Sequence, residues 1–389
     1  MAAPAATTRS GLRIFGATLG VGGVVAILAL SHYYVAKRFF LDPAWAAPWG
    51  AAGAALVALG FLGFFALPVI ERKLGPPWKQ RLAFPTYVWM GVLWLGFAAW
   101  VFADAFGALL GLAGAAPIDA ATRSLAVGAL VLAASAVALR SGLRIPSVRR
   151  QEVALPRWPA ALDGFRIAQI SDIHIGAVLD RSFAQGLTER VNGLDADLVV
   201  VTGDLVDGPV DRLREDVAPF AALRARHGVF FVTGNHDVYS GDVAWVERVR
   251  ELGIHALRNE RVALGGDAGF DLAGVDDHRG DWRGDSSEDL GAALEGRDPA
   301  RATVLLAHDP STFKRARTMG IDLQISGHTH GGQLWPFHAL VRLAIPWVQG
   351  LHREGDAQLW VSRGSGFWGP PMRLFAPSEV SELVIRAAP

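Results

Sequence analysis

Four long apolar runs near the start of this chain constrain its fold more than any other feature. They cover residues 12–34, 49–70, 86–103 and 124–139. A helix needs roughly 20 mainly apolar residues to cross the hydrocarbon core of a bilayer. The fourth run reaches that length if it extends toward Ile145 with the Arg140 side chain snorkelling to the headgroups. We therefore predict an N-terminal all-α membrane domain of four transmembrane helices in residues 1–145, followed by a second domain in residues 146–389.

Positive charges in the short loops predict how this membrane domain is oriented, because cytoplasmic loops are enriched in Lys and Arg. One side carries Arg9, Arg13, Arg72, Lys73, Lys79, Arg81, Arg140, Arg144, Arg149 and Arg150, and the other carries Lys37, Arg38 and Arg123. We expect the N-terminus and the second domain to be cytoplasmic, in a multi-pass protein of the inner (cytoplasmic) membrane. Because the runs contain almost no ionisable residues, we expect an anchor in the lipid bilayer rather than a transporter.

Composition narrows the chemistry that the second domain can perform. The 37 basic and 37 acidic residues give a formal net charge of zero, so we expect no nucleic-acid partner. The chain has no cysteine. Disulfides, thiolate metal ligands and a cysteine nucleophile are therefore excluded.

Residues after 150 alternate short apolar strands with helical segments, which predicts an α/β sheet with covered faces. The strands predicted at residues 165–170, 197–201, 228–232, 302–306 and 321–325 are each followed by Asp, Asn or His. In an open α/β sheet, ligands bind beyond the carboxyl ends of the strands. We expect the polar residues at these ends to converge on one site, and they are Asp172, His174, Asp204, Asn235, His308, His328 and His330.

These side chains offer oxygen and imidazole nitrogen donors without thiolate, a set that suits divalent Mn, Fe, Zn, Co or Mg. They exceed the needs of one ion, which indicates a two-metal site. Ions in such a site lie roughly 3.5–4 Å apart and activate water for displacement at phosphorus. The alternative, that these residues only cap strands and helices, would leave their convergence unexplained.

The motifs follow one another as Asp-x-His, Gly-Asp-x-x-Asp, Gly-Asn-His-Asp, a lone His and Gly-His-x-His. In this order they resemble the calcineurin-like metallophosphoesterase superfamily over residues 153–386. Later segments, residues 362–366 and 371–373, are similar to the bacterial membrane-anchored branch related to UDP-2,3-diacylglucosamine hydrolases. The resemblance implies a four-layer α/β/β/α sandwich that hydrolyses a phosphoester or pyrophosphate bond by a metal-bridging hydroxide.

The resemblance also implies a role for each motif residue. The members of the first metal site would be Asp172, His174 and His330, and those of the second Asn235, His308 and His328. Asp204 would bridge the two ions. His236 would act as the catalytic acid beside the phosphoryl group, with Asp207 as its orienting partner.

One departure from the superfamily concerns the phosphate. In its protein serine/threonine phosphatases an Arg follows the dyad Asp, whereas Gly208-Pro209 follows Asp207 here. This argues against protein phosphatase activity. Arg363 and Arg373 are the candidates for binding the phosphate of the substrate.

The apolar run at residues 334–351 has two interpretations. A run this apolar is usually part of the core. The alternative is a lip for acyl chains or for the membrane surface beside the site, which an enzyme with a lipid-linked substrate would need. We expect the substrate to be a small-molecule or lipid-linked phosphoester. As a different function, the same fold could serve as a membrane sensor or scaffold that binds metal or nucleotide without turnover.

Overall fold

The computed structural model describes residues 22–75, 77–266, 268–278 and 287–388, and the chain divides into two compact units, Met1–Ala136 and Val137–Pro389. The beginning of the first predicted span and the charges of Arg9 and Arg13 lie outside the described residues. Each unit is described by itself below. The last two turns of the fourth long helix, residues 137–143, belong to the second unit.

The first unit is built from helices that are long and apolar enough to cross a membrane, and these are Gly22–Leu41, α2 (Trp49–Lys73), α3 (Trp78–Leu112) and α4 (Ala120–Leu143). Prolines mark where two of them begin, because Pro48 and Pro77 precede α2 and α3. Proline lacks the amide donor that a helix interior requires but is tolerated at a helix start. The predicted number of four apolar helices is confirmed, and α4 extends four residues past Leu139 as its length required.

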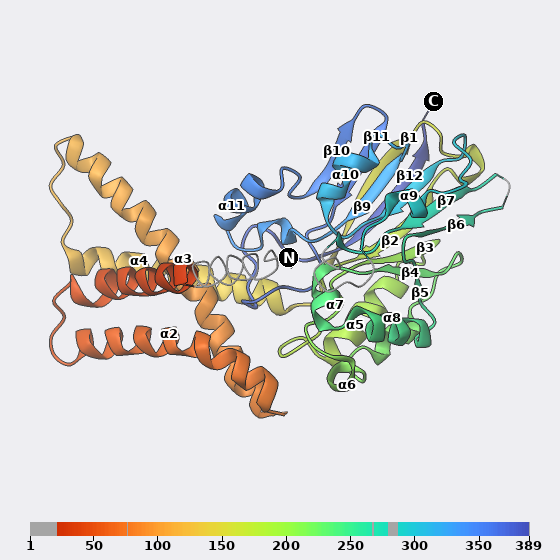
Figure 1. Ribbon diagram of the computed structural model, residues 1–389. Helices are drawn as coiled ribbons and strands as arrows, with labels where there is room; N and C mark the ends of the chain where they lie inside the picture. Colours follow the sequence, from red (N-terminus) through yellow and green to blue (C-terminus); the bar gives the residue numbers. More distant parts are fainter. Residues whose placement is uncertain (1–21, 76, 267, 279–286, 389) are drawn as a thin grey trace, which may run out of the picture. The chain divides into compact units, whose positions relative to one another are not determined.

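The second unit contains two mixed six-stranded sheets (Figure 1). The first sheet has the order β1 (Ser147–Leu155), β12 (Glu379–Ala387), β2 (Phe165–Ile170), β3 (Leu198–Thr202), β4 (Val229–Val232) and β5 (His255–Ala256). The second has the order β10 (Gly350–Glu354), β11 (Ala357–Val361), β9 (Leu323–Ser326), β8 (Thr303–Leu306), β7 (Phe270–Gly274) and β6 (Glu260–Leu264).

Buried apolar side chains join these sheets and their helices into layers. One cluster lies between the sheets and combines Ile167, Leu198 and Phe230 of the first with Val304 and Ile325 of the second. Two other clusters pack helices against the sheets, namely α5 (Arg181–Asn192), α6 (Val210–Leu213), α8 (Asp242–Glu251), α9 (Leu290–Ala293) and α10 (Phe313–Ala316). Two further helices of this unit are α7 (Asn235–Ser240) and α11 (Phe337–Ala344). The predicted α/β sandwich is confirmed.

Strand direction explains why the motifs can meet. β2, β3 and β4 run parallel in the first sheet, and β7, β8 and β9 run parallel in the second. Parallel strands in a sheet end at the same edge, so the loops that follow them are neighbours. Each motif of the sequence lies in one of these loops or at the start of the helix after it.

Two segments of the second unit differ from regular helices packed in a core. After β3 the chain forms only the short α6 followed by a 3-10 turn, Ala218–Ala222, because Pro219 within that turn cannot continue an α-helix. The core interpretation of residues 334–351 fails for α11, because none of the residues in this helix is buried. The side chains of Phe337, Leu340 and Leu343 are exposed instead.

Candidate metal centre

The predicted ligands come together at the carboxyl ends of the parallel strands. Asp172 and His174 follow β2, Asp204 follows β3, and Asn235 begins α7 after β4. In the second sheet, the loop after β8 provides one histidine and the loop after β9 provides two, which are His308, His328 and His330. Apart from the partly buried His328, these side chains are buried.

Backbone conformation singles out most of these residues. Asp172, His174, Asp204, His328 and His330 have φ between 51° and 71°, and they make up half of the non-glycine residues with positive φ in the described part of the chain. An L-residue in this left-handed region is disfavoured by contact between its Cβ and the backbone. Such strain persists where the surroundings hold it in place, and it concentrates at functional sites.

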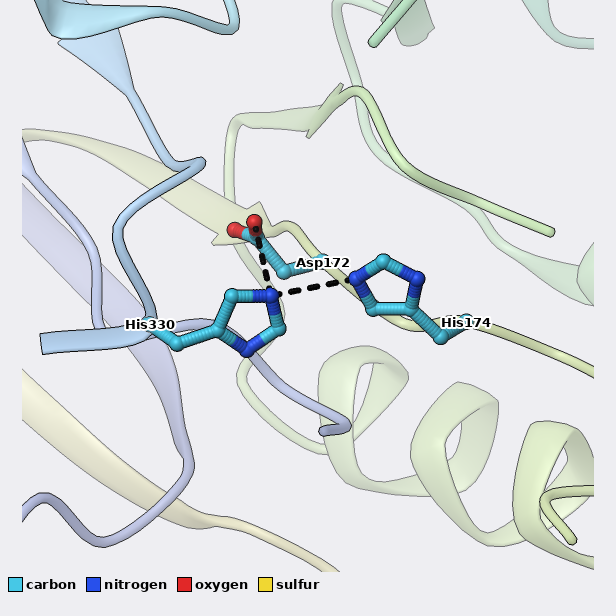
Figure 2. A group of neighbouring side chains, drawn as sticks. All are labelled: Asp172, His174 and His330. Atoms are coloured by element: carbon cyan, nitrogen blue, oxygen red, sulfur yellow. Dashed lines mark hydrogen bonds and ion pairs between the residues drawn. The ribbon is translucent and has the colours of Figure 1, made fainter. Parts of the chain in front are cut away.

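The first group of donor atoms contains Asp172, His174 and His330 (Figure 2). Figure 2 shows His330 with its Nε2 directed at both partners, 3.1 Å from the Nε2 of His174 and 3.5 Å from the Oδ1 of Asp172. The same Oδ1 accepts a hydrogen bond from the backbone N–H of His328 at 2.8 Å. Three donors from two sheets therefore face one small volume.

The second group contains Asp204, His308 and His328. The Nε2 of His308 lies 3.2 Å from the Nδ1 of His328 and 3.2 Å from the Oδ2 of Asp204. On its other side, the Nδ1 of His308 donates to the carbonyl oxygen of Thr202 at 2.8 Å. This hydrogen bond fixes the ring of His308 with its Nε2 facing the group.

Asp204 lies between the two groups. Its Oδ2 is 3.2 Å from the Nε2 of His308 and 3.7 Å from the Nε2 of His174. Its Oδ1 accepts the backbone N–H of His236 at 2.8 Å, which fixes the carboxylate plane. One carboxylate oxygen thus faces imidazoles of both groups.

The donor set fits divalent metal ions. The Oδ2 of Asp172 and the Oδ1 of Asn235 are buried without a hydrogen-bond partner among the described residues. A buried polar atom without a partner costs about 1–3 kcal/mol, and bound cations would satisfy these oxygens. Space is also reserved there, because a Cβ added at Gly327 would lie 2.2 Å from that Oδ2. Oxygen and imidazole donors at this spacing are ligands of hard or borderline divalent ions.

Beside the first group, Asp207 connects two histidines. Its Oδ1 accepts from the Nδ1 of His236 at 2.7 Å and from the Nδ1 of His174 at 3.0 Å. His236 is partly exposed, and its ring packs edge-on against His174 and Trp368. One carboxylate therefore orients a candidate ligand and the candidate acid together, a double role that the Gly-Asp-x-x-Asp motif alone did not reveal.

The two arginines predicted to bind phosphate already have partners. Nε of Arg363 donates to the carboxylate of the buried Glu379 at 2.6 Å. Arg373 is buried, and its guanidinium donates to the carbonyl oxygens of Gly366, His330, Arg363 and Ala376. It also lies 3.2 Å from the Nδ1 of His330, so it holds that ring from behind.

Protonation differs between the paired histidines. Burial opposes a charge on His174, but the carboxylates of Asp207, Asp204 and Asp172 outweigh it and raise its pKa to about 9. Burial lowers the pKa of His330 well below its ordinary value, and the positive charges of His174 and Arg373 lower it further. The rings of this pair therefore hold protons with unequal strength, His174 more tightly than His330.

Asp237, the last residue of Gly-Asn-His-Asp, has a structural role that sequence analysis missed. Its carboxylate accepts the backbone N–H groups of Asp204, Leu205 and Gly234 at 2.8–2.9 Å. It thereby joins the loop after β3 to the start of α7. Burial and the nearby charge of Asp204 raise its pKa to about 7. Its position in the motif, three residues after Gly234, is the spacing of a helix-capping side chain and was a usable signal.

Known proteins are similar in sequence to this chain. The family model described as calcineurin-like phosphoesterase matches residues 165–332. An uncharacterized metallophosphoesterase of Helicobacter pylori is 37% identical over 244 residues, which cover 62% of this chain and 64% of that protein. The chain thus spans less than two thirds of the length of this relative.

Two further relatives are covered more fully. A transmembrane protein with metallophosphoesterase domain from Danio rerio is 35% identical over 352 residues, which cover 86% of this chain and 79% of that protein. An uncharacterized metallophosphoesterase of Aquifex aeolicus is 32% identical over 225 residues, 57% of this chain and 85% of the relative. With four apolar helices before the matched domain, the chain is a membrane protein, and it belongs to the calcineurin-like metallophosphoesterase superfamily.

Proposed function

We propose that this protein is a membrane-anchored phosphoesterase that uses two divalent metal ions to hydrolyse a phosphoester or pyrophosphate bond. The position of Asp204 carries the proposal, because one of its oxygens faces His308 at 3.2 Å and His174 at 3.7 Å. A carboxylate that faces two separate donor groups is what a shared ligand requires. The membership of the family supports the same class of reaction.

In this proposal each ion has its own ligands beside the shared Asp204. Asp172, His174 and His330 hold one ion, and the others hold the second, namely Asn235, His308 and His328. Two bound divalent ions would polarise the phosphoryl oxygens and lower the pKa of the attacking water. Which of Mn, Fe, Zn, Co or Mg is bound depends on supply as well as on the donors.

His236 is the proposed general acid. Its Nδ1 is held by Asp207 at 2.7 Å, so its Nε2 is the ring nitrogen left to protonate the leaving oxygen. The carboxylate partner keeps the ring in one tautomer. Partial exposure of the side chain gives a substrate access to it.

The substrate class extends the proposal. A lipid-linked phosphoester, as in the branch related to UDP-2,3-diacylglucosamine hydrolases, suits an enzyme held in a membrane. Contact of Arg363 or Arg373 with the substrate phosphate stays a prediction, since both guanidinium groups have the protein partners given above. For Arg373 we propose a second role, the positioning of His330.

Orientation and domain limits belong to the proposal as well. The excess of Lys and Arg on one side of the four helices supports a cytoplasmic phosphoesterase domain at the inner membrane. We place the membrane anchor in residues 1–145 and the phosphoesterase domain in residues 146–389.

Purified full-length protein, reconstituted with Mn²⁺, tests the function. We expect hydrolysis of at least one member of a panel that contains an aryl phosphodiester, UDP-diacylglucosamine, lipid phosphates and lipid pyrophosphates. Asp204→Ala should lower turnover by roughly a hundredfold or more and reduce metal content, because both ions lose a ligand. Metal content is measured by mass spectrometry of the dialysed protein.

Asp211→Ala is the matched control, because Asp211 is exposed on α6 in the same domain. It should leave turnover and metal content unchanged. Two bound ions without turnover of any substrate would favour the sensor or scaffold function instead. Equal turnover of the wild type and Asp204→Ala would refute catalysis at this site.

A further inference from the structure

Helix α11 has its polar and apolar faces in the reverse of the usual arrangement. His338 and Arg342, one turn apart, line a pocket of about 370 Å³ within the phosphoesterase unit. The apolar residues Leu340 and Leu343 are instead 50% and 85% exposed. A helix on the surface of a water-soluble domain normally turns its apolar face inward. The outer face of α11 therefore fits an apolar environment outside the domain.

The pocket behind α11 adjoins the candidate metal centre. Gly331 and Gly332 form part of its wall, and they follow His330 directly. Arg342 is exposed and forms no salt bridge with any described residue. The pocket is thus lined by the cationic Arg342 and by the residues that follow the proposed metal ligand His330.

A second exposed segment continues this surface. The backbone N–H of Leu374 donates to Gln333 at 2.9 Å, and that of Trp335 donates to Leu374 at 3.3 Å. The ring of Phe375 meets the ring of Trp335 edge-on and is 77% exposed. We call Trp335, Phe337, Leu340, Leu343 and Phe375 the α11 surface.

The end of α4 places this segment at the level of the membrane boundary. The backbone N–H of Arg373 donates to the carbonyl oxygen of Ala138 in α4 at 2.9 Å. Gly142 packs closely there, since a Cβ on it would lie 2.4 Å from the carbonyl oxygen of Pro371. The 24 residues of α4 extend about 36 Å, slightly more than the hydrocarbon core, so its last turns end at the interface.

We propose that the α11 surface lies in the interfacial layer of the bilayer that α4 crosses, with the pocket opening at the level of the lipid headgroups. Burial of apolar side chains in this layer stabilises the contact in proportion to the area removed from water. Charge fits the same partner, because Arg140 and Arg144 are exposed at the end of α4 and Arg342 is exposed in the pocket. Anionic phospholipid headgroups complement these cations.

This contact goes beyond the proposed function, because it does not depend on turnover. It gives a route by which a phosphate-bearing lipid can reach the metal centre without leaving the membrane. Tryptophan and tyrosine are common in the interfacial layer of a bilayer, and the α11 surface contains Trp335.

The lack of cysteine in the chain makes the test direct. Leu343→Cys in the full-length protein is labelled with an environment-sensitive fluorophore and reconstituted in vesicles of phosphatidylcholine and phosphatidylglycerol. Lipids that carry a spin label near the headgroup should quench the fluorescence of the Leu343→Cys label several-fold more strongly than that of the control label described below. The emission of the Leu343→Cys label should also shift to the blue.

Val243→Cys is the matched control, because Val243 is 54% exposed on α8, away from α11 in the same domain (Figure 1). Its label should respond to an aqueous quencher and not to the lipids. A Leu343 label that responds to the aqueous quencher as the control does would overturn the proposal. Protection of the Leu343 label from the aqueous quencher in vesicles, but not in nanodiscs that hold one chain each, would also overturn the proposal. A second copy of the chain, rather than the bilayer, would then cover the α11 surface.

Failure of this test is distinguishable from failure of the proposed function. The labelled variants are assayed for metal content, which reports whether the phosphoesterase domain is folded around its site. Leu340→Cys gives a second position on the same face and should be quenched by the same lipids. Quenching without any hydrolysis would support the bilayer contact and count only against catalysis.

Discussion

At the scale of single residues, the candidate site is held under backbone strain. A left-handed conformation costs an L-residue about 1–2 kcal/mol, and five of the proposed ligands adopt it. Hydrogen bonds to the loops offset part of this cost, such as the one from His328 N–H to Asp172. Coordination of cations by the unpartnered oxygens of Asp172 and Asn235, one for each proposed ion, would stabilise the arrangement further.

Metal binding should release protons, because ligand histidines must be neutral. The pKa of His174 is raised to about 9, so this residue carries a proton at neutral pH before an ion binds. A proton competes with the ion below that pKa and not above it. We therefore expect affinity for the first ion to rise by about tenfold per pH unit up to pH 9.

Calorimetric titration of the full-length protein with Mn²⁺ in buffers of different ionisation enthalpy measures the released protons. His174→Gln should lower the number of protons released. An affinity independent of pH in the neutral range would contradict the assignment of His174 as a protonated ligand.

The candidate metal ligands could be predicted from the sequence because only a few residue types can bind a divalent ion. Asp172, His174 and Asp204 stand directly after apolar strands, and strand ends are where ligands bind. The partners that orient these ligands were not accessible. Arg373 reaches His330 from 43 positions away, and no local pattern specifies that contact.

At the scale of elements, the loops after the strands must pass very close to one another. A Cβ on Gly327 would lie 2.0 Å from the hydroxyl of Ser171 and 2.2 Å from the carboxylate of Asp172. Both distances are far below ordinary van der Waals contact. The loop after β9 can therefore approach the loop after β2 only where it has no side chain.

Gly327→Ala should force these two loops apart. We expect a loss of stability of about 1–3 kcal/mol, typical of overpacking, together with weaker metal binding. Denaturant unfolding and metal analysis measure the two effects. Gly111→Ala in α3, where an added Cβ meets nothing within 4 Å, is the control and should change neither. A Gly327→Ala protein with normal metal content would show that the loops can separate without harm.

Elements differ in how well their sequence specified them. β3 and β8 were recognisable because a short continuous apolar run is typical of a strand buried on both faces. For α11 the same kind of apolar run left two interpretations open, core or a lip, and the lack of buried residues in this helix excludes the core. Hydropathy reports that a side chain avoids water, and it does not distinguish a protein core from a lipid interface.

At the scale of the whole molecule, the four apolar helices make topology testable. The cysteine-free chain permits single-cysteine labelling at Ala116, in the turn after α3, and at the exposed Asp356 of the phosphoesterase domain. In intact spheroplasts of a bacterial host, a membrane-impermeant maleimide should label Ala116→Cys. Asp356→Cys should be labelled only after permeabilisation, because the positive loops retain that side in the cytoplasm. The opposite pattern would place the phosphoesterase domain outside.

Arg373 joins the last turns of α4 to the metal centre through a single residue. Its backbone N–H is bonded to Ala138, and its guanidinium holds the ring and the carbonyl oxygen of His330. The end of α4 is therefore part of the fold around the site and not a flexible linker. A shortened protein that begins at Ser147 would leave the backbone amide of Arg373 without its acceptor, so soluble versions of the domain should be designed to begin before Val137.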